Sequence, residues 1–209
     1  MNVYFPSCNF SKTSPEAAKK IRAYLKAFMP VAGCCRVDKT PRAQEDTAIY
    51  FCQACRDVVE DHMQTRSLWE YLDADSAFPF PDYSGLRMNL QDCWRDRDHP
   101  EIHEAVRNLL KKMHIEFTAL SPDGADANFC GNLHAEPENP AILAEMEQYS
   151  GKPIYEMPPS LEEAIMREQA AKCTERWVVA YCNRCKLGLT TGGASAVHLL
   201  ELLMGTAKL

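Results

Sequence analysis

Short apolar runs alternate along the chain with longer stretches in which apolar residues recur at helical spacing. Residues 3–5 form the first apolar run, and Ser14-Pro15-Glu16 then gives the cap and proline typical of a helix start. Apolar positions from 17 to 28 recur every three or four residues, which predicts a helix. A second strand is predicted at 48–51. The apolar positions between 58 and 72 predict a single helix after it.

The same order of elements returns in the second part of the chain. Strands are expected at 86–90, 115–120 and 177–181, and helices at 100–113 and 194–204. Alternation of strands and helices favours an α/β fold in which the strands are mainly parallel.

A proline-rich segment at 78–85 separates the two series and is the best candidate for a linker. The first half then covers residues 1–77. The second half covers 86–209 and carries an insertion at about 132–172. We therefore predict two pseudo-symmetric, Rossmann-like halves in one chain, with ligands collecting at the C-terminal edges of the strands.

Composition narrows the class of protein. Of the 209 residues, 46% are hydrophobic, which is enough for a core without a disulfide scaffold. The first residues do not look like a secretory signal, and no run approaches the ~18 apolar residues of a membrane span. A cytoplasmic, reducing location is therefore expected, where cysteines are usually metal-bound or redox-active. The net charge of −6 argues against a nucleic-acid partner.

Nine of the ten cysteines fall into one spacing pattern that occurs twice. Clustered thiols at repeated spacing are typical of a metal or iron–sulfur site, because thiolate is the ligand. Four of these cysteines directly follow predicted strands, at the edge where ligands collect. The first cysteine set consists of Cys8, Cys34, Cys35, Cys52 and Cys55, and the second cysteine set consists of Cys93, Cys130, Cys182 and Cys185.

Each set leaves alternatives open. The two Cys-x-x-Cys pairs suit metal or cluster ligation, with a thioredoxin-like redox motif as the competing interpretation. The adjacent Cys34 and Cys35 suit different irons of a polynuclear cluster, or one ligand beside a bystander. The second set matches a closed four-thiolate zinc site or an ordinary iron–sulfur cluster, or it is a degenerate copy that binds nothing. Cys173 precedes the strand 177–181 and is expected to lie outside both sets.

A cysteine, then Cys-Cys-Gly, then Cys-x-x-Cys, duplicated along one chain, resembles the cysteine-rich CCG-domain family. That family includes the cysteine-rich subunit of heterodisulfide reductase. The resemblance spans essentially the whole chain from Cys8 to the helix after Cys185. Two departures stand out. Arg36 replaces the glycine after the first pair, and Phe129 replaces the first cysteine of the second pair.

The resemblance implies an iron–sulfur redox protein that acts in electron transfer or in reduction of a disulfide. It implies a noncubane-type [4Fe–4S] cluster on the first set, where Cys34 and Cys35 would be cluster-bound catalytic residues. The second set would hold zinc or a second cluster. Because the chain lacks a ferredoxin-type cysteine run, an iron–sulfur or flavin subunit would donate the electrons. The alternatives are a zinc-binding structural or assembly module without turnover and a thiol-based redox sensor, so enzymatic activity stays open.

Overall fold

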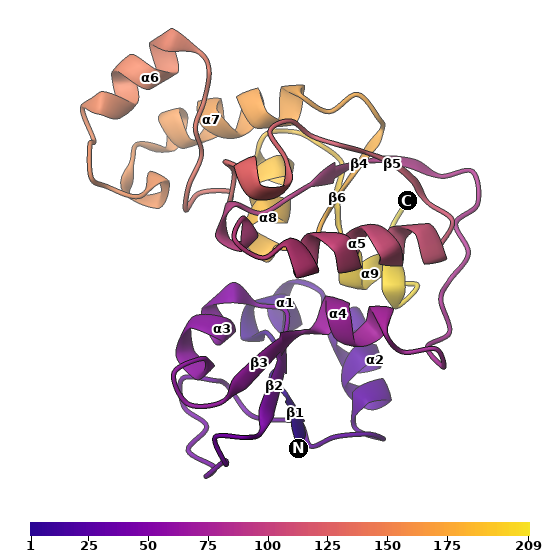
Figure 1. Ribbon diagram of the computed structural model, residues 1–209. Coiled ribbons are helices and arrows are strands. Elements are labelled where there is room, and N and C mark those ends of the chain that lie inside the picture. Colours follow the sequence, from indigo (N-terminus) through magenta and orange to yellow (C-terminus); the bar gives the residue numbers. More distant parts are fainter.

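The computed structural model describes residues 1–209 and contains two parallel β-sheets (Figure 1). The strands are β1 (Asn2–Tyr4), β2 (Thr47–Tyr50), β3 (Gln64–Ser67), β4 (Arg87–Gln91), β5 (Glu116–Ala119), β6 (Trp177–Ala180) and β7 (Ala196–His198). The α-helices are α1 (Cys8–Thr13), α2 (Pro15–Leu25), α3 (Gln53–Val59), α4 (Leu68–Asp73), α5 (Pro100–Lys112), α6 (Pro140–Glu147), α7 (Pro159–Ala171), α8 (Asn183–Thr191) and α9 (Leu199–Leu203). Three short 3₁₀ turns are η1 (Trp94–Asp96), η2 (Gly124–Asp126) and η3 (Ile154–Glu156).

The two sheets repeat one topology. The first has the strand order β1-β2-β3, the second has β5-β4-β6-β7, and every strand pair is parallel. Strands β1, β2 and β3 therefore correspond to β4, β6 and β7. Val31 makes a single parallel bridge to Tyr4, at the position that β5 occupies in the second sheet. The predicted α/β class with two parallel-stranded halves is confirmed.

Two strands, β3 and β7, were not predicted from the sequence, and they occupy equivalent positions in the two sheets. The predicted helix over 58–72 is wrong, because α3 ends at Val59, β3 follows, and α4 begins at Leu68. The predicted helix over 194–204 likewise begins with β7. Both are short edge strands. The residues of β3 are mostly polar and only partly buried, so they lack the apolar alternation that marks a strand.

A short capped helix follows each of these edge strands. Ser67 and Glu70 form a capping box at the start of α4, and His198 and Glu201 form one at the start of α9. In both halves, the helix that contains the second cysteine of the Cys-x-x-Cys pair (α3 or α8) is therefore followed by an edge strand and then by a helix with a capping box.

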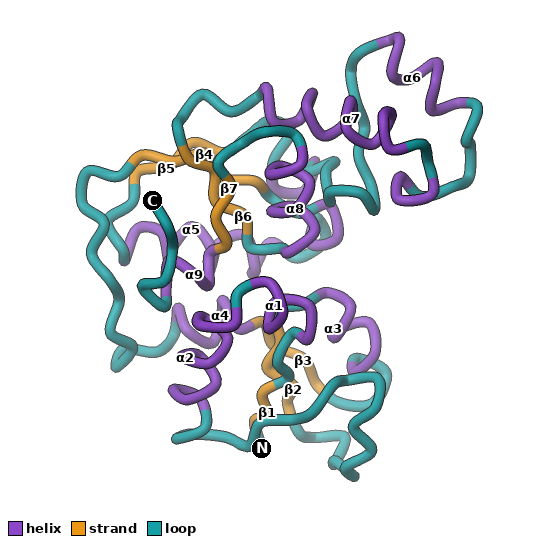
Figure 2. Tube along the Cα trace, turned by 180° about the vertical axis from the view of Figure 1, so that it is seen from behind, coloured by secondary structure: helices purple, strands orange, loops and turns teal.

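One hydrophobic core extends through both halves. Its 43 buried residues come from both sheets and from the helices between them. Aromatic rings meet where the halves join, with Phe10 and His198 centroids 4.6 Å apart and Trp69 and Tyr181 centroids 6.5 Å apart. In Figure 2, α1 and α4 of the first half lie against the second half, and α4 packs on α5. The Pro-rich segment 78–85 runs beside this junction without forming a helix or strand, and the Tyr83 hydroxyl donates to the Leu202 carbonyl.

The insertion at 132–172 contains α6, η3 and α7, and it extends from one side of the molecule (Figure 1). No residue of α6 is buried, whereas α7 packs against α8. None of the helices has the length and apolar character needed to cross a membrane.

Candidate metal centre

The cysteines of both sets lie at the C-terminal ends of parallel strands. Cys52, Cys93 and Cys182 each come two residues after a strand, and each is the N-cap of the next helical element. Cys8 opens α1 after Ser7, whose hydroxyl accepts a hydrogen bond from the Phe10 N–H. Because the ends of parallel strands meet at one edge, this placement gathers residues that are far apart in the chain.

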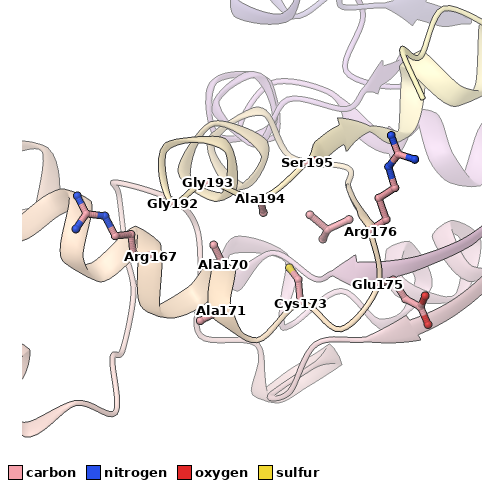
Figure 3. A pocket seen from close by; sticks show the side chains of 11 residues that line it. Arg167, Ala170, Ala171, Cys173, Glu175, Arg176, Gly192, Gly193, Ala194 and Ser195 are labelled. Carbon is pink, nitrogen blue, oxygen red and sulfur yellow. The ribbon is translucent and has the colours of Figure 1, made fainter.

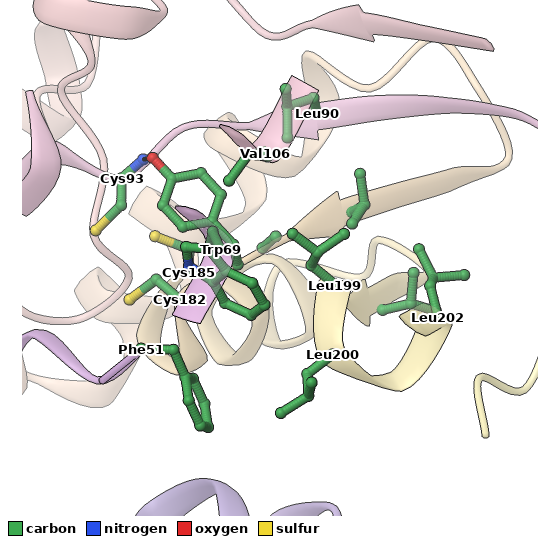
Figure 4. Close-up of a cluster of buried hydrophobic side chains, with 14 of the residues drawn as sticks. Phe51, Trp69, Leu90, Cys93, Val106, Cys182, Cys185, Leu199, Leu200 and Leu202 are labelled. Carbon is green, nitrogen blue, oxygen red and sulfur yellow. Dashed lines mark hydrogen bonds between the residues drawn. The ribbon is translucent and has the colours of Figure 1, made fainter. Parts of the chain in front are cut away.

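The second cysteine set is closed and buried. All four sulfur atoms lie within 4.8 Å of one another, and no side chain of the set is more than 4% exposed. The Sγ atom of Cys130 is 3.6 Å from that of Cys93 and 4.0 Å from that of Cys182. In Figure 4 the sulfurs of Cys93, Cys182 and Cys185 point to the same side of the buried apolar cluster. Four thiols at this spacing can ligate one metal ion.

Backbone contacts hold the second set in place. The Tyr181 hydroxyl accepts a 3.0 Å hydrogen bond from the Cys93 N–H, and the Cys130 N–H donates to the His134 carbonyl at 2.7 Å. Tyr181 is fully buried, so its hydroxyl takes the place of a water molecule as the acceptor for the Cys93 N–H.

Gly131, directly after Cys130, allows the cysteine-bearing loop to touch α8. Its φ is +56°, and an added Cβ would lie 2.1 Å from the Arg184 carbonyl oxygen. A Cβ on Gly188 of α8 would in turn lie 2.7 Å from the Gly131 Cα. Only glycine fits at this crossing, since both positions bring backbone against backbone.

One thiolate is favoured within the second set. Hydrogen bonds from the Cys130, Cys185 and Cys93 thiols hold the pKa of Cys182 well below its usual range. Burial holds the pKa values of Cys93 and Cys185 well above theirs. Because a metal ion binds the thiolate form, binding of a cation would favour release of protons from the thiols whose pKa values are raised.

The first cysteine set is more open than the second. Cys8 is exposed, Cys55 is buried, and the other three are partly buried. Its thiols interact in series, Cys8 with Cys34, Cys34 with Cys35, Cys35 with Cys55, and Cys55 with Cys52. The second set is the only group of thiols, imidazoles and carboxylates whose ligand atoms all lie within 4.8 Å of one another. The structure therefore brings the five thiols into one neighbourhood without closing them around a point.

Cys52 and Cys34 are the two members of the first set whose pKa values are lowered. The Cys55 thiol, together with nearby backbone N–H groups and Ser7, lowers the pKa of Cys52 to about 6, although burial opposes this shift. The same contact with Cys52, and then burial, raises the pKa of Cys55. Cys34 also has a lowered pKa, first through the Arg36 N–H and then through the Cys8 thiol.

Cys173 lies apart from both sets, as expected. It lines a cavity of about 480 Å³ between the end of α7 and the segment before β7, together with Arg167 and Arg176 (Figure 3). Burial raises the pKa of the Cys173 thiol. No other cysteine contributes to this shift.

A cavity of about 340 Å³ separates the two sets, and we call it the Cys52–Cys182 cavity after the cysteine that each set contributes to its wall. Arg95 and Arg184 also line it. Arg95 pairs with Asp57, whereas Arg184 donates to the Asn132 side-chain oxygen at 2.7 Å and has no carboxylate partner. Arg184 therefore contributes a positive charge without a carboxylate partner to the cavity wall, which also includes one thiol of each set.

A buried polar link joins the two sets behind this cavity. The Asp96 carboxylate, on the turn after Cys93, accepts 2.6 Å hydrogen bonds from Gln53 and Arg56 of α3. Arg56 also donates to the Arg95 carbonyl at 2.7 Å. Burial raises the pKa of Asp96, and the charge of Arg56 opposes this shift.

Sequence analysis missed this link and the role of Tyr181. One signal was available, since Asp96 follows Cys93 at the same three-residue interval that separates the cysteines of each Cys-x-x-Cys pair. Nothing in the sequence alone points from Tyr181 to the Cys93 amide. No protein-family model, curated protein or solved structure matches the chain.

Proposed function

We propose that the chain is a metal-dependent redox protein similar to the cysteine-rich subunit of heterodisulfide reductase, in which the second cysteine set holds one zinc ion and the first holds an iron–sulfur cluster. The observation that carries the proposal is the closed group of four buried thiols, whose member Cys182 lines one cavity together with Cys52 of the five-thiol set.

The spacing of the second set favours a single ion. Tetrahedral zinc with Zn–S bonds of ~2.3 Å separates its sulfurs by ~3.8 Å. The Cys130–Cys93 and Cys130–Cys182 sulfur separations of 3.6 and 4.0 Å bracket that value. Thiolates on different irons of a cluster would stand further apart, because the irons lie between them. A donor set of four thiols with no carboxylate also suits zinc or iron rather than magnesium or calcium.

The first set has the features that a larger group needs. It offers five thiols rather than four, and they are spread rather than closed. Cys34 and Cys35 are adjacent in the chain, so both can reach a polynuclear cluster through different irons. A cluster bound here would supply one-electron redox chemistry.

The Cys52–Cys182 cavity supports a disulfide as substrate. Its reduction consumes two electrons and two protons and yields two thiols, with an iron–sulfur or flavin subunit as the electron donor. Arg184 would bind an acidic group of the substrate, and the aromatic ring of Phe51 in the cavity wall would exclude water. The partly buried Cys52 lies at the first-set side of this cavity.

A zinc-binding structural module without turnover is the second candidate. The closed geometry of the second set favours it, since four buried thiols around one ion leave no open position for a substrate.

Metal analysis of anaerobically purified protein distinguishes these functions. We expect about four irons, about one zinc ion and broad visible absorption. A colourless protein with about two zinc ions would contradict the redox function and support the structural module.

Serine variants then assign each metal to a cysteine set. Cys93→Ser should lose zinc and keep iron, whereas Cys34→Ser and Cys35→Ser should each lose or alter the iron chromophore and keep zinc. Cys173→Ser is the matched control and should change neither. Retention of the full spectrum by Cys34→Ser or Cys35→Ser would contradict a five-thiol cluster.

A further inference from the structure

A second cavity, of about 370 Å³, opens beside Cys35 and shares no residue with the Cys52–Cys182 cavity. We call it the Cys35 cavity. Its inner side is apolar, since Phe5, Val59 and Met63 are 3, 6 and 7% exposed. Its outer wall is formed by polar residues of the segment 35–42. The volume lies at the lower end of the range of ~300–1,000 Å³ that small-molecule sites occupy.

The only acidic residue of the Cys35 cavity is fully engaged. Asp38 forms a 2.8 Å ion pair with Arg42 and accepts hydrogen bonds from the Gly33 and Thr40 N–H groups. The Arg42 guanidinium lies over the Phe5 ring, 5.0 Å from its centroid. The charges of Asp38 and Arg42 therefore cancel within the cavity wall.

Two positive charges in the wall have no such partner. Arg36 and Lys39 line the cavity, and neither forms an ion pair. The exposed imidazole of His62 stands on the same wall. In a chain with a net charge of −6, this is a local concentration of positive charge above an apolar surface.

Arg36 also marks a difference between the two halves. It follows the first cysteine pair at the place where the second half has Gly131. Gly131 is required by the backbone of α8, whereas the exposed Arg36 has the Cys35 cavity beside it.

We propose that the Cys35 cavity binds a small organic anion, whose carboxylate or phosphate lies between Arg36 and Lys39 and whose apolar body rests on Val59 and Met63. This site goes beyond the proposed function, because the side chains that would contact the anion, Arg36, Lys39, Val59 and Met63, are not proposed metal ligands. A ligand held here lies against the first cysteine set without entering the Cys52–Cys182 cavity.

Met63 provides a reporter inside the cavity. The protein as purified, with its metal retained, is labelled with ¹³C at the methionine methyl groups, and the Met63 signal is assigned with Met63→Leu. Benzoate, phenyl phosphate and benzamide are titrated in turn. Both anions should shift the Met63 signal saturably, and neutral benzamide, which has nearly the shape of benzoate, should bind at least about 10-fold more weakly. Added salt should weaken binding of the two anions and leave binding of benzamide unchanged.

A double variant tests the two charges. Arg36→Gln with Lys39→Gln should weaken benzoate binding about 10-fold or more. Both side chains are exposed, so the fold should persist, and circular dichroism checks this. The matched control combines Arg167→Gln with Arg176→Gln. It removes two cations from the other cavity, which Cys173 lines, and should leave benzoate binding unchanged (Figure 3).

Four results would overturn the inference. Two concern affinity: equal binding of benzoate and benzamide, and unchanged benzoate affinity in the Arg36/Lys39 variant. The other two concern the signals: shifts confined to methionines other than Met63, and no shift at ~20 mM anion, a concentration at which even millimolar binding would be detected. Iron and zinc are measured on the same samples, so failure here with metal retained leaves the proposed function intact.

Discussion

The Arg56 guanidinium donates to the Asp96 carboxylate at 2.6 Å, and this ion pair joins the helix after Cys52 to the turn after Cys93. The two side chains are 8 and 1% exposed. The distance between the two cysteine sets therefore depends on a charge pair that water does not reach.

Replacing one partner of the Arg56–Asp96 ion pair should destabilise the protein strongly. Arg56→Met leaves the Asp96 carboxylate buried with only Gln53 as a partner, and we expect a loss of roughly 3–5 kcal/mol in the free energy of unfolding, measured in urea. Arg56→Met with Asp96→Leu should recover part of this loss. The control is Arg167→Met, which breaks an exposed pair with Glu163 and should cost less than about 0.5 kcal/mol. Equal losses in Arg56→Met and Arg167→Met would refute this interpretation of the pair.

The crossing of the Cys130 loop and α8 should not tolerate a methyl group. Gly131→Ala places a Cβ against the Arg184 carbonyl and requires an unfavourable φ, so we expect at least ~3 kcal/mol of destabilisation and loss of zinc from the second set. Gly85→Ala has a similar positive φ and open space around its Cβ, and should cost only ~1 kcal/mol with zinc retained. The comparison separates the clash from the backbone strain. Zinc retention in Gly131→Ala would argue that the loop can move away.

The hydroxyl of Tyr181 should matter for metal retention. Tyr181→Phe leaves the Cys93 N–H without a partner, which should cost ~1–3 kcal/mol of stability. Because the Cys93 backbone is then free to move, zinc should be lost ~10-fold or more faster to a chelator. Tyr83→Phe removes a 3.0 Å hydrogen bond to Leu202 away from the cysteines, and zinc release should be unaffected. Identical release rates in the two variants would show that Tyr181 has no role at the site.

The reactivity of Cys52 should rise at unusually low pH. The thiolate is the nucleophile, and the pKa of Cys52 is lowered to about 6, so alkylation by iodoacetamide in metal-free protein should increase as the pH rises through about 6. Burial raises the pKa of Cys173, which should react only above its ordinary range near pH 8.5. Mass spectrometry of alkylated peptides measures both cysteines in one sample. A Cys52 midpoint above pH 8 would exclude the contacts proposed to stabilise its thiolate.

The sequence predicted the α/β class well because most strands are buried and apolar. Residues 177–181 form an apolar run that ends at Cys182, and residues 86–90 alternate apolar and polar side chains shortly before Cys93; the structure has strands at both places. The edge strand β3 was missed because its residues are polar, and β7 was missed because its three residues run directly into the apolar residues of α9. Their capping residues, such as Ser67 and Glu70, were visible in the sequence, but an apolar spacing compatible with one long helix concealed them.

The candidate site was predictable to a different degree. Repeated spacing identifies which cysteines belong together, since a Cys-x-x-Cys pair at a helix start has a fixed local geometry. Spacing does not reveal how far apart the sulfurs of Cys93 and Cys130 lie, because a 37-residue separation is closed by the packing of distant elements. The metal assignment of each set stays a prediction.

The core of 43 residues that both halves share has a consequence for how the repeat behaves as a molecule. Each half covers the other's aromatic face, with Trp69 on one side and His198 on the other. A fragment cut at the Pro-rich segment would expose that face to solvent, so neither half should survive as an independent folding unit. The duplicated halves have become obligate partners: they should melt in one cooperative transition, and damage at one cysteine set should lower the melting temperature of the whole chain.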